Sequence, residues 1–302
     1  MKKIVVIGVC LIIAVGFPFT KARSEKGIIS VGSINPSPKE EITKFQPFID
    51  YLAKHLNKFG ITKGEVVVAG SMEEMASLIK NDKVDIFIDS SFPTIKVCRF
   101  SGAKPFLRRW KKGNKEYSSV IFVRKDSGIN TLSDLKGKII AFENPYSTSA
   151  YLVPKAILLK EDLTLTEKRE IGEGVSSDEV GYIFAQDEEN IMVWVLRKMV
   201  FAGALDNIEY ESFAHDSLGE LKVLVESVKM PRQVVSHRAN LRPELVSEIE
   251  RVLINMDKDE EGKKILKVFE KTAKFDKFPK GVDESLKPIK ELMNYIEKGL
   301  GK

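Results

Sequence analysis

IISVGSI at residues 28–34, EVVVA at residues 65–69 and VDIFI at residues 84–88 are three short apolar runs of the kind that form buried strands. Two segments with helical spacing of apolar residues separate them, at residues 45–56 and 72–80. Strand, helix, strand, helix and strand therefore alternate along one short part of the chain. This alternation predicts a parallel α/β sheet with right-handed crossover connections.

A second set of elements follows. Strands are predicted at residues 119–123 and 139–142, near Ile208 and at residues 222–227, and helices at residues 149–160, 189–200, 242–256, 259–272 and 282–298. The chain is long enough for two α/β lobes, one of residues 23–120 and 226–302 and one of residues 121–225. The strands at residues 119–123 and 222–227 are expected to cross between the lobes. Two lobes joined in this way form a cleft between them, and small ligands bind in clefts between lobes.

The first 22 residues have the features of an export signal. Lys2 and Lys3 give a positive start, Ile4 to Val15 form an apolar core, and Thr20-Lys21-Ala22 offers small residues for cleavage. We therefore expect residues 1–22 to be a signal peptide that directs the protein to the periplasm. Because the cleavage site is imperfect, an uncleaved membrane anchor is the alternative interpretation.

The charge of the chain argues against a nucleic-acid partner. The net charge of +5 falls to about +2 without the first 22 residues, which hold three lysines and no acidic residue. The run from Arg108 to Lys112 is locally basic, and we interpret it as a solvated surface turn with a packed Trp110, a ligand or partner contact being the alternative. Cys98 is the one cysteine left after cleavage, so no disulfide within the chain is available, and an unreactive buried thiol is expected.

Residues 135–154, LKGKIIAFENPYSTSAYLVP, hold the main candidate site. A strand leads through the Asn144-Pro145 turn to three hydroxyl side chains, Ser147, Thr148 and Ser149, at the start of a predicted helix. A helix start leaves backbone N–H groups without partners and carries partial positive charge, so hydroxyl groups there can complete an anion site. Plain N-capping is the other interpretation, because Ser and Thr are favoured at helix starts in any case.

A second candidate lies after the predicted strand at residues 84–88. Ser90 and Ser91 follow this strand, and the carboxyl ends of strands in an α/β sheet present the loops that contact ligands. We expect ligand contacts from both serines, with helix capping as their alternative role.

The sequence offers no catalytic or metal-binding motif. Its three histidines (His55, His215 and His237) are scattered without the spacing of metal ligands, and neither a nucleophile elbow nor a phosphate-binding glycine loop is present. We therefore predict a monomeric binding protein with no cofactor and no metal, and not an enzyme. Because one fold can host many functions, an exported enzyme remains an alternative.

Several segments resemble the type 2 periplasmic binding proteins of the phosphate, phosphite and phosphonate transporter group. These segments are FQPFIDYL at residues 45–52, KVDI at residues 83–86, YSSVIFVRKDSG at residues 117–128, LSDLKGK at residues 132–138, the Ser-Thr-Ser that follows, and a late segment at residues 262–278. The resemblance covers nearly all of the chain after the signal. LSDLKGK is shared widely and indicates the fold, whereas the hydroxyl triplet before a helix is more specific.

The resemblance implies a two-lobed fold, with two Rossmann-like lobes joined by two crossing strands. It also implies an extracytoplasmic solute-binding role in an ABC uptake system, with an inner-membrane permease as partner. In that family the hydroxyl triplet holds the anionic head of a phosphate- or phosphonate-like ligand, which assigns this role to Ser147, Thr148 and Ser149. Tyr117 is carried over to the same site, with aromatic packing at the lobe junction as its alternative role.

Three departures from the family pattern concern the ligand. Met72 stands where the family has a tyrosine, Phe201 stands where it has an aspartate, and Asp187-Glu188-Glu189-Asn190 replaces a histidine. We expect Glu188 and Glu189 to contact the ligand, although carboxylates have the wrong sign for a doubly charged phosphoryl group. A charged helix start is their alternative role. The alternative functions are binding of a cationic or zwitterionic molecule, and ligand sensing for a membrane signalling partner.

Overall fold

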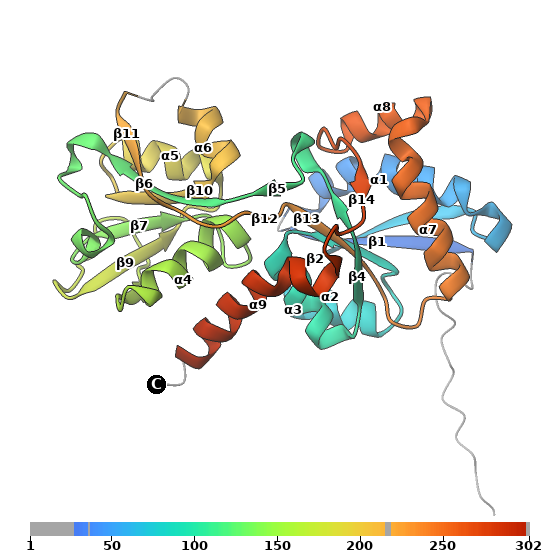
Figure 1. Ribbon diagram of the computed structural model, residues 1–302, viewed down its shortest axis with the longest axis horizontal. Coiled ribbons are helices and arrows are strands. Elements are labelled where there is room, and N and C mark those ends of the chain that lie inside the picture. The colour runs from blue at the N-terminus through green and yellow to red at the C-terminus, as the bar shows by residue number, and fades with distance from the viewer. Residues whose placement is uncertain (1–26, 36, 215–218, 300–302) are drawn as a thin grey trace, which may run out of the picture.

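The computed structural model describes residues 27–35, 37–214 and 219–299 of the chain. Their fold is α/β, as predicted, with two six-stranded sheets and a two-stranded ladder between them (Figure 1). The expected signal peptide, residues 1–22, lies outside the described residues. No helix in the described part of the chain is long and apolar enough to span a membrane.

The first sheet contains the three predicted strands of the N-terminal segment and three later ones. Its strands are β1 (Ile28–Ile34), β2 (Lys63–Ala69), β3 (Ile86–Asp89), β4 (Lys104–Arg109), β13 (Gln233–His237) and β14 (Phe275–Asp276). Their order is β14-β4-β13-β3-β1-β2, and β1 is parallel to both β2 and β3. β13 comes from a much later part of the sequence and pairs antiparallel with both β3 and β4. We call the part of the molecule built on this sheet lobe 1.

The second sheet carries lobe 2. Its strands are β6 (Ser119–Arg124), β7 (Ile139–Phe142), β8 (Thr164–Glu167), β9 (Glu179–Phe184), β10 (Ala202–Asp206) and β11 (Leu221–Glu226), in the order β11-β6-β10-β7-β9-β8. β7 is parallel to β9 and β10. The strand predicted near Ile208 is wrong in position, because Asp206 accepts backbone N–H groups of Ile208 and Glu209 at 2.9 Å and so begins a helix there.

Helices pack against both sheets. Lobe 1 has α1 (Pro38–His55), α2 (Met72–Lys80), α3 (Ser91–Ser101), α7 (Pro243–Asn255), α8 (Glu260–Val268) and α9 (Gly281–Gly299), and lobe 2 has α4 (Val153–Lys160), α5 (Glu188–Leu196) and α6 (Asn207–Ala214). α1 begins well before the predicted residue 45, because Pro38 fits the first turn of a helix. α5 ends before the predicted residue 200, at a turn in which Lys198 has a left-handed φ of 61°.

The connection between the lobes differs from the prediction. Residues 119–123 and 222–227 do not cross between lobes but lie in β6 and β11, which pair antiparallel inside the second sheet. The connecting ladder is instead formed by β5 (Glu116–Tyr117) and β12 (Met230–Pro231), which Figure 1 shows between the two sheets. The chain therefore passes between the lobes on either side of this short ladder.

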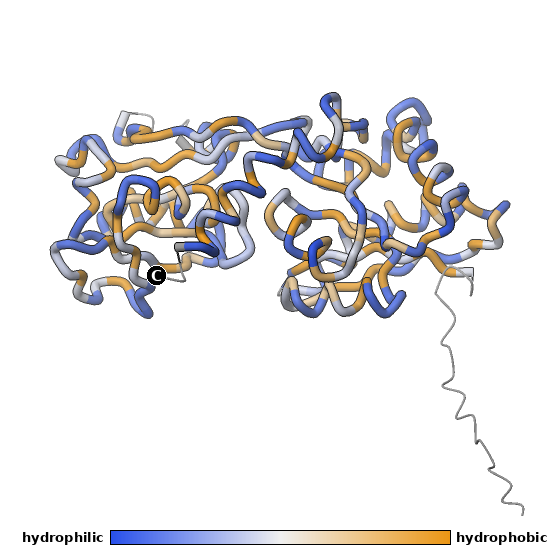
Figure 2. Tube along the Cα trace, turned by 60° about the horizontal axis from the view of Figure 1, so that its bottom comes forward, coloured by the Kyte–Doolittle hydropathy of each residue, from blue (hydrophilic) through white to orange (hydrophobic). Residues whose placement is uncertain are grey.

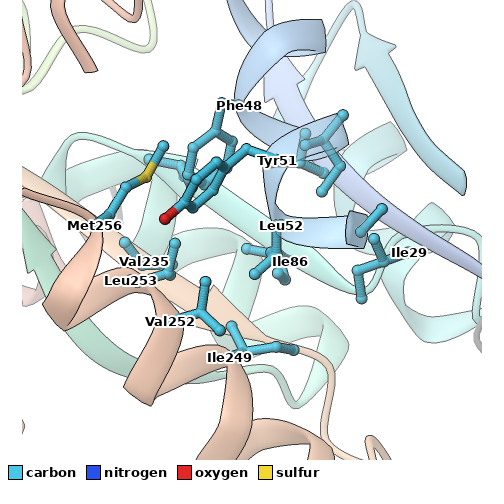
Figure 3. Close-up of a cluster of buried hydrophobic side chains, with 14 of the residues drawn as sticks. Ile29, Phe48, Tyr51, Leu52, Ile86, Val235, Ile249, Val252, Leu253 and Met256 are labelled. Atoms are coloured by element: carbon cyan, nitrogen blue, oxygen red, sulfur yellow. The ribbon is translucent and has the colours of Figure 1, made fainter. Parts of the chain in front are cut away.

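Apolar packing in the core of lobe 1 holds α1 and α7 against each other and against the first sheet. Figure 3 shows Phe48, Tyr51 and Leu52 of α1 close to Val252 and Leu253 of α7. Side chains of β1, β3 and β13 complete this cluster, which is almost wholly excluded from solvent. In Figure 2 the apolar colour follows the interior strands, whereas loops and outer helix faces are polar. Burial of these apolar faces fixes the sheet and thus the ends of its strands.

The basic run from Arg108 to Lys112 is not the solvated turn that the sequence predicts. Arg108 is 4% exposed and binds Asp276 through two hydrogen bonds of 3.0 and 2.6 Å, while Arg109 is fully buried against Glu270 at 2.9 Å. Both arginines lie in β4, and their acidic partners come from the distant segment around β14. The charges are therefore neutralised within the fold and do not form a basic surface.

Candidate functional site

A pocket of about 150 Å³ lies between the two lobes. Lobe 1 and its loops contribute Ile34, Asp89, Ser90, Lys111 and Gln233, and lobe 2 contributes Glu143, Asn144, Tyr146, Ser147, Thr148, Ser149, Glu188 and Asp206. Tyr117 and Arg232, which belong to the connecting segments, complete the lining. The pocket thus brings together most of the residues selected from the sequence and several that the sequence analysis missed.

The hydroxyl triplet lies at a helix start, as predicted. A single π-helical turn, Thr148–Leu152, runs into α4, and Ser147 occupies the N-cap position. Ser147 Oγ accepts the backbone N–H of Ala150 at 3.1 Å. Ser147, Thr148 and Ser149 are all at least nine-tenths buried, so each of their hydroxyl groups needs a partner in the protein or in a ligand.

Thr148 joins the two lobes. Its Oγ1 donates to Ser90 Oγ at 2.9 Å and accepts the backbone N–H of Phe92 at 3.0 Å. Since Ser90 and Phe92 belong to lobe 1 and Thr148 to lobe 2, these bonds hold the lobes together beside the pocket.

Tyr117 and Ser149 meet at the connecting ladder. Tyr117 lines the pocket beside Thr148 and Ser149, and burial raises the pKa of its hydroxyl well above the ordinary value. The Arg232 guanidinium lies over the Tyr117 ring, 4.9 Å from its centroid. The backbone oxygen of Ser149 accepts a hydrogen bond from Ser119 Oγ at 2.5 Å. Tyr117 therefore both packs at the lobe junction and faces the pocket.

Two residues selected from the sequence do not line the pocket. Ser91 is fully buried, and its Oγ donates to the backbone oxygen of Pro231 at 2.9 Å, which ties α3 to the ladder. Glu189 is exposed on the outside of α5, whose N-cap is Asp187. Ser91 lies at the start of α3 and Glu189 lies in α5. Each side chain points away from that of the preceding residue, which lines the pocket, because neighbouring residues on a helix point in different directions. Glu188, one residue earlier, lines the pocket.

The sequence analysis missed three acidic residues that the structure places in the pocket. Asp89 is the last residue of β3, Asp206 is the last residue of β10, and Glu143 directly follows β7. A signal was available, because each of these strands is parallel to a neighbour and α/β proteins bind ligands beyond the carboxyl ends of such strands. By the same rule, Ser90 and Ser91 were predicted to contact a ligand.

Two cationic residues also line the pocket, and both are paired within the protein. Arg232 was missed, whereas Lys111 belongs to the basic run for which a ligand contact was the alternative role. Arg232 Nη1 donates to Asp206 Oδ2 at 2.6 Å, whereas the buried Nε of Arg232 has no partner among the described residues. Lys111 Nζ lies 3.0 Å from Glu270 Oε1. Although burial acts to raise the pKa of Glu270, the charges of Lys111 and Arg109 lower it to about 2. These ion pairs bring together residues far apart in the chain, so no local motif reveals them.

Three pocket carboxyl groups have no cationic partner. Within the described ranges, no Lys, Arg or His nitrogen lies within 4.0 Å of a carboxylate oxygen of Asp89, Glu143 or Glu188. Burial raises the pKa of Asp89 to about 7, and burial together with the charge of Glu143 raises that of Glu188 to about 8. Burial also raises the pKa of Glu143, although Ser147 and Asn144 act on its carboxyl group as hydrogen-bond partners. The three carboxyl groups therefore have no ion-pair partner in direct contact, although the charges of Lys111 and Lys112 act on them from a longer distance.

One acidic group has the spacing of a metal site. Glu188, Asp206 and Glu209 can place carboxylate oxygens within 4.8 Å of one another. Arg232 already pairs with Asp206, and Lys112 pairs with Glu209 across the lobes. Because two of the three carboxylates already have cationic side chains as partners, we assign no metal to this cluster.

Comparison with known proteins places the chain in a family of transport proteins. The family model described as ABC transporter, phosphonate, periplasmic substrate-binding protein matches residues 34–284. The phosphonates-binding periplasmic protein of Escherichia coli (strain K12) is 25% identical over 288 residues, which cover 91% of this chain and 79% of that protein.

Solved structures agree on the fold. XAC2383 from Xanthomonas citri, seen bound to chloride ion, has a TM-score of 0.82 at 23% identity, over 90% of this chain and 98% of that one. PhnD1 from Prochlorococcus marinus, in complex with methylphosphonate, has a TM-score of 0.67 at 18% identity, over 90% and 99%. At these identities the likeness concerns the two-lobed fold, whereas the family model covers most of the sequence. The chain belongs to the periplasmic substrate-binding proteins of phosphonate ABC transporters.

Proposed function

We propose that this protein is the solute-binding component of an ABC uptake system and that its ligand is a small molecule with a positively charged group. The ligand would occupy the pocket between the lobes, and the closed protein would deliver it to a membrane permease. The observation that carries the proposal is the set of three pocket carboxyl groups, Asp89, Glu143 and Glu188, that lack cationic partners.

The physical reason is the cost of negative charge that is partly removed from water, since Asp89, Glu143 and Glu188 are half-buried. Carboxylates removed from water without a partner either take up protons or destabilise the fold, and their raised pKa values express that cost. An ammonium or quaternary amine among Asp89, Glu143 and Glu188 would supply the missing charge and lower all three pKa values. A doubly charged phosphoryl group would add to the repulsion, so the phosphate- or phosphonate-like ligand expected from the sequence is the less favoured of the two ligand classes.

The same pocket has groups suited to a polar or anionic end of such a molecule. Arg232, Tyr117 and Ser149 line it, and the buried Nε of Arg232 has no partner among the described residues. The proposal therefore includes zwitterions as well as simple organic cations. Hinge motion about the β5–β12 ladder would open and close the pocket.

A ligand screen tests this proposal. Thermal shift and calorimetry on residues 23–302 would compare ethanolamine, choline, amino acids and an aminoalkylphosphonate with inorganic phosphate, sulfate and methylphosphonate. We expect stabilisation of several degrees by at least one amine-containing compound and none by the amine-free anions. Stabilisation by methylphosphonate or phosphate alone would overturn the proposal.

Two neighbouring glutamates provide a matched control. Glu188→Gln removes a pocket carboxylate, and Glu189→Gln removes an exposed one from the adjacent position of the same helix. We expect the first change to weaken binding of the amine-containing compound about tenfold and the second to leave it unchanged. Equal effects of the two changes would count against a charge-selective pocket.

A further inference from the structure

A second cavity, of about 390 Å³, lies outside the pocket and is lined by residues of both lobes. Lobe 1 contributes residues of α2, α3 and α9, and lobe 2 contributes Pro145 with residues of the π-helical turn and of α4. We call this cavity the α9 groove. Among the described residues it shares no lining residue with the pocket, and it is more than twice as large. Its volume is typical of sites that hold small organic molecules.

The helix α9 forms one wall of the α9 groove, and both lobes hold it in place. It packs against α3 of lobe 1 and against α4 of lobe 2 (Figure 1). On the lobe 1 side, Arg99 Nη1 donates to the two carboxylate oxygens of Glu297 at 2.8 and 3.0 Å. On the lobe 2 side, the Tyr295 hydroxyl donates to the backbone oxygen of Leu159 at 3.1 Å. The wall is therefore a fixed part of the fold.

Much of the groove lining is apolar. Its apolar side chains come from four elements and include Met72, Phe92, Leu152, Met293 and Ile296. These five belong to one buried apolar cluster to which both lobes contribute. Two of them are methionines, whose flexible side chains adapt to the shape of an apolar ligand. The lining therefore suits the hydrocarbon part of a small molecule.

The charged residues of the α9 groove differ in whether an opposite charge pairs with them. Lys96 Nζ lies 3.0 Å from Glu73, and Glu297 is paired with Arg99. In the part of the chain that the structure describes, no carboxylate oxygen lies within 4.0 Å of the nitrogen of Lys155. Lys155 thus leaves the groove with one positive charge that no acidic side chain neutralises.

The ammonium group of Lys155 is positioned by aromatic side chains. It lies over the rings of Tyr151 and Tyr182, at 5.0 and 5.1 Å from their centroids. It donates one hydrogen bond, to the Tyr151 hydroxyl oxygen at 2.9 Å. Since an ammonium group has three N–H donors, two are not used by the described residues and can bind a ligand oxygen.

We propose that the α9 groove is a second binding site, and that its ligand is an aliphatic carboxylate. The hydrocarbon chain lies against the apolar lining, and the carboxylate accepts hydrogen bonds from Lys155. Charge complementarity carries this choice, because Lys155 is the cationic lining residue that lacks an acidic partner in the described ranges. The site goes beyond the proposed function, since it lies outside the pocket and does not depend on the ligand held there.

The test compares two probes with the same chain length and opposite charge. Calorimetry on residues 23–302 would measure the affinities of octanoate and octylamine for the wild type, Lys155→Glu and Lys160→Glu. Lys160 is a matched control, because it lies on the same helix, is exposed and does not line the groove. Circular dichroism melting checks that each variant is folded, and Lys155→Met replaces Lys155→Glu if the latter is not.

We expect the wild type to bind octanoate at least tenfold more tightly than octylamine. Lys155→Glu should lower the octanoate affinity at least tenfold and raise that of octylamine, Lys155→Met should lower the octanoate affinity alone, and Lys160→Glu should change neither.

Three results would overturn the proposal. The first is no binding of octanoate by the wild type. The second is equal affinity for the two probes, which would mean that apolar contact alone drives binding, and the third is an equal effect of the changes at Lys155 and Lys160. Sedimentation of the wild type gives a further check, because a stable dimer from which octanoate is excluded would mean that a second copy of the chain covers the groove.

Discussion

Two buried arginines, Arg109 in the core of lobe 1 and Arg232 at the pocket, differ in how completely their guanidinium groups are hydrogen-bonded within the protein. Arg109 is fully buried, and its guanidinium lies 3.6 Å from the ring centroid of Phe269. Arg232 is 6% exposed and lies 4.9 Å from the ring centroid of Tyr117. Every nitrogen of the Arg109 guanidinium donates a hydrogen bond, whereas Arg232 Nε has no partner in the described part of the chain.

The difference separates an arginine whose guanidinium donors are all used within the protein from one that lines the pocket with a donor unused. A buried donor without an acceptor costs free energy, so a protein keeps one where water or a ligand can satisfy it. Arg109 has four acceptors, at distances of 2.6 to 3.0 Å, and has nothing left to offer a ligand. Arg232 lines the pocket and keeps a buried donor without an acceptor among the described residues, and the comparison can be tested by changing each residue.

The largest effect is expected at Arg109. Arg109→Met should lower the free energy of unfolding by about 3–5 kcal/mol, because Glu270 loses a buried ion pair and Thr272 and Gln233 lose their donor. Urea denaturation at pH 7 measures this loss. Arg109→Lys should recover only part of it, because an ammonium cannot reproduce the planar fork. A loss below about 1 kcal/mol would contradict a structural role for this network.

A smaller loss of stability is expected at Arg232. Arg232→Met should lower the free energy of unfolding by about 1–3 kcal/mol, because Asp206 keeps two backbone N–H donors from the start of α6. Urea denaturation would be paired with calorimetry against an amine-containing zwitterion, whose affinity should fall. Equal losses of stability in Arg232→Met and Arg109→Met would remove the distinction drawn between the two sites.

The acidic side chain paired with Arg109 and the unpaired acidic side chains of the pocket should give opposite dependences of stability on pH. The pKa of Glu270, lowered to about 2, means that its ion pairs stabilise the fold above its ordinary pKa and are lost as the pH falls towards 2. The pKa values of Asp89 and Glu188, raised to about 7 and 8, mean that stability present at low pH is lost as the pH rises from about 4 to 8.

Urea midpoints at pH 5 and pH 8 measure the pocket contribution. The free energy of unfolding of the ligand-free wild type should fall over this interval, and the double variant Asp89→Asn/Glu188→Gln should show a flatter profile. Binding of an organic cation should tighten over the same interval, because Asp89, Glu143 and Glu188 then bear their charges beside the paired Lys111 and Arg232. Cation affinity that weakens as the pH rises would contradict this assignment.

The smallest effect is expected at Ser91, a buried polar group outside the pocket. Ser91→Ala removes one hydrogen bond to Pro231 and should cost about 0.5–1.5 kcal/mol of stability. Like Arg109, Ser91 is satisfied within the protein, so ligand affinity should stay unchanged. Thermal melting measures the stability and calorimetry measures the ligand affinity of this variant. A loss of affinity without a loss of stability would mean that Ser91 contacts the ligand after all.

The fold was largely accessible from the sequence, because alternating apolar runs and helical patterns depend on local spacing. The parallel start of lobe 1 and the helix at the hydroxyl triplet are confirmed. The position of the crossing segments was not accessible. β5 and β12 have two residues each, which is too few to show a periodic pattern. β6 and β11 are longer and more apolar, so the crossing between the lobes was predicted there instead.

The site was accessible only in part. Ser147, Thr148 and Ser149 stand out as a local motif, and their arrangement at the pocket follows from it. The charge balance of the pocket depends on pairs such as Arg232 with Asp206 and Lys111 with Glu270, whose members meet only through the tertiary fold. The sequence therefore indicated a helix start suited to anions. The structure adds carboxyl groups to the same pocket, and their negative charge would repel an anion.

The ladder between the lobes has a consequence for how long a ligand stays bound. Tyr117 lies in β5, and Arg232 directly follows β12, so in the hinge motion proposed above the segments that bend would also line the pocket. A ligand held by these two residues resists the bending directly, and its departure and the opening of the lobes become one kinetic event. The residence time of the ligand is then set by the stiffness of a ladder only two residues long on each side.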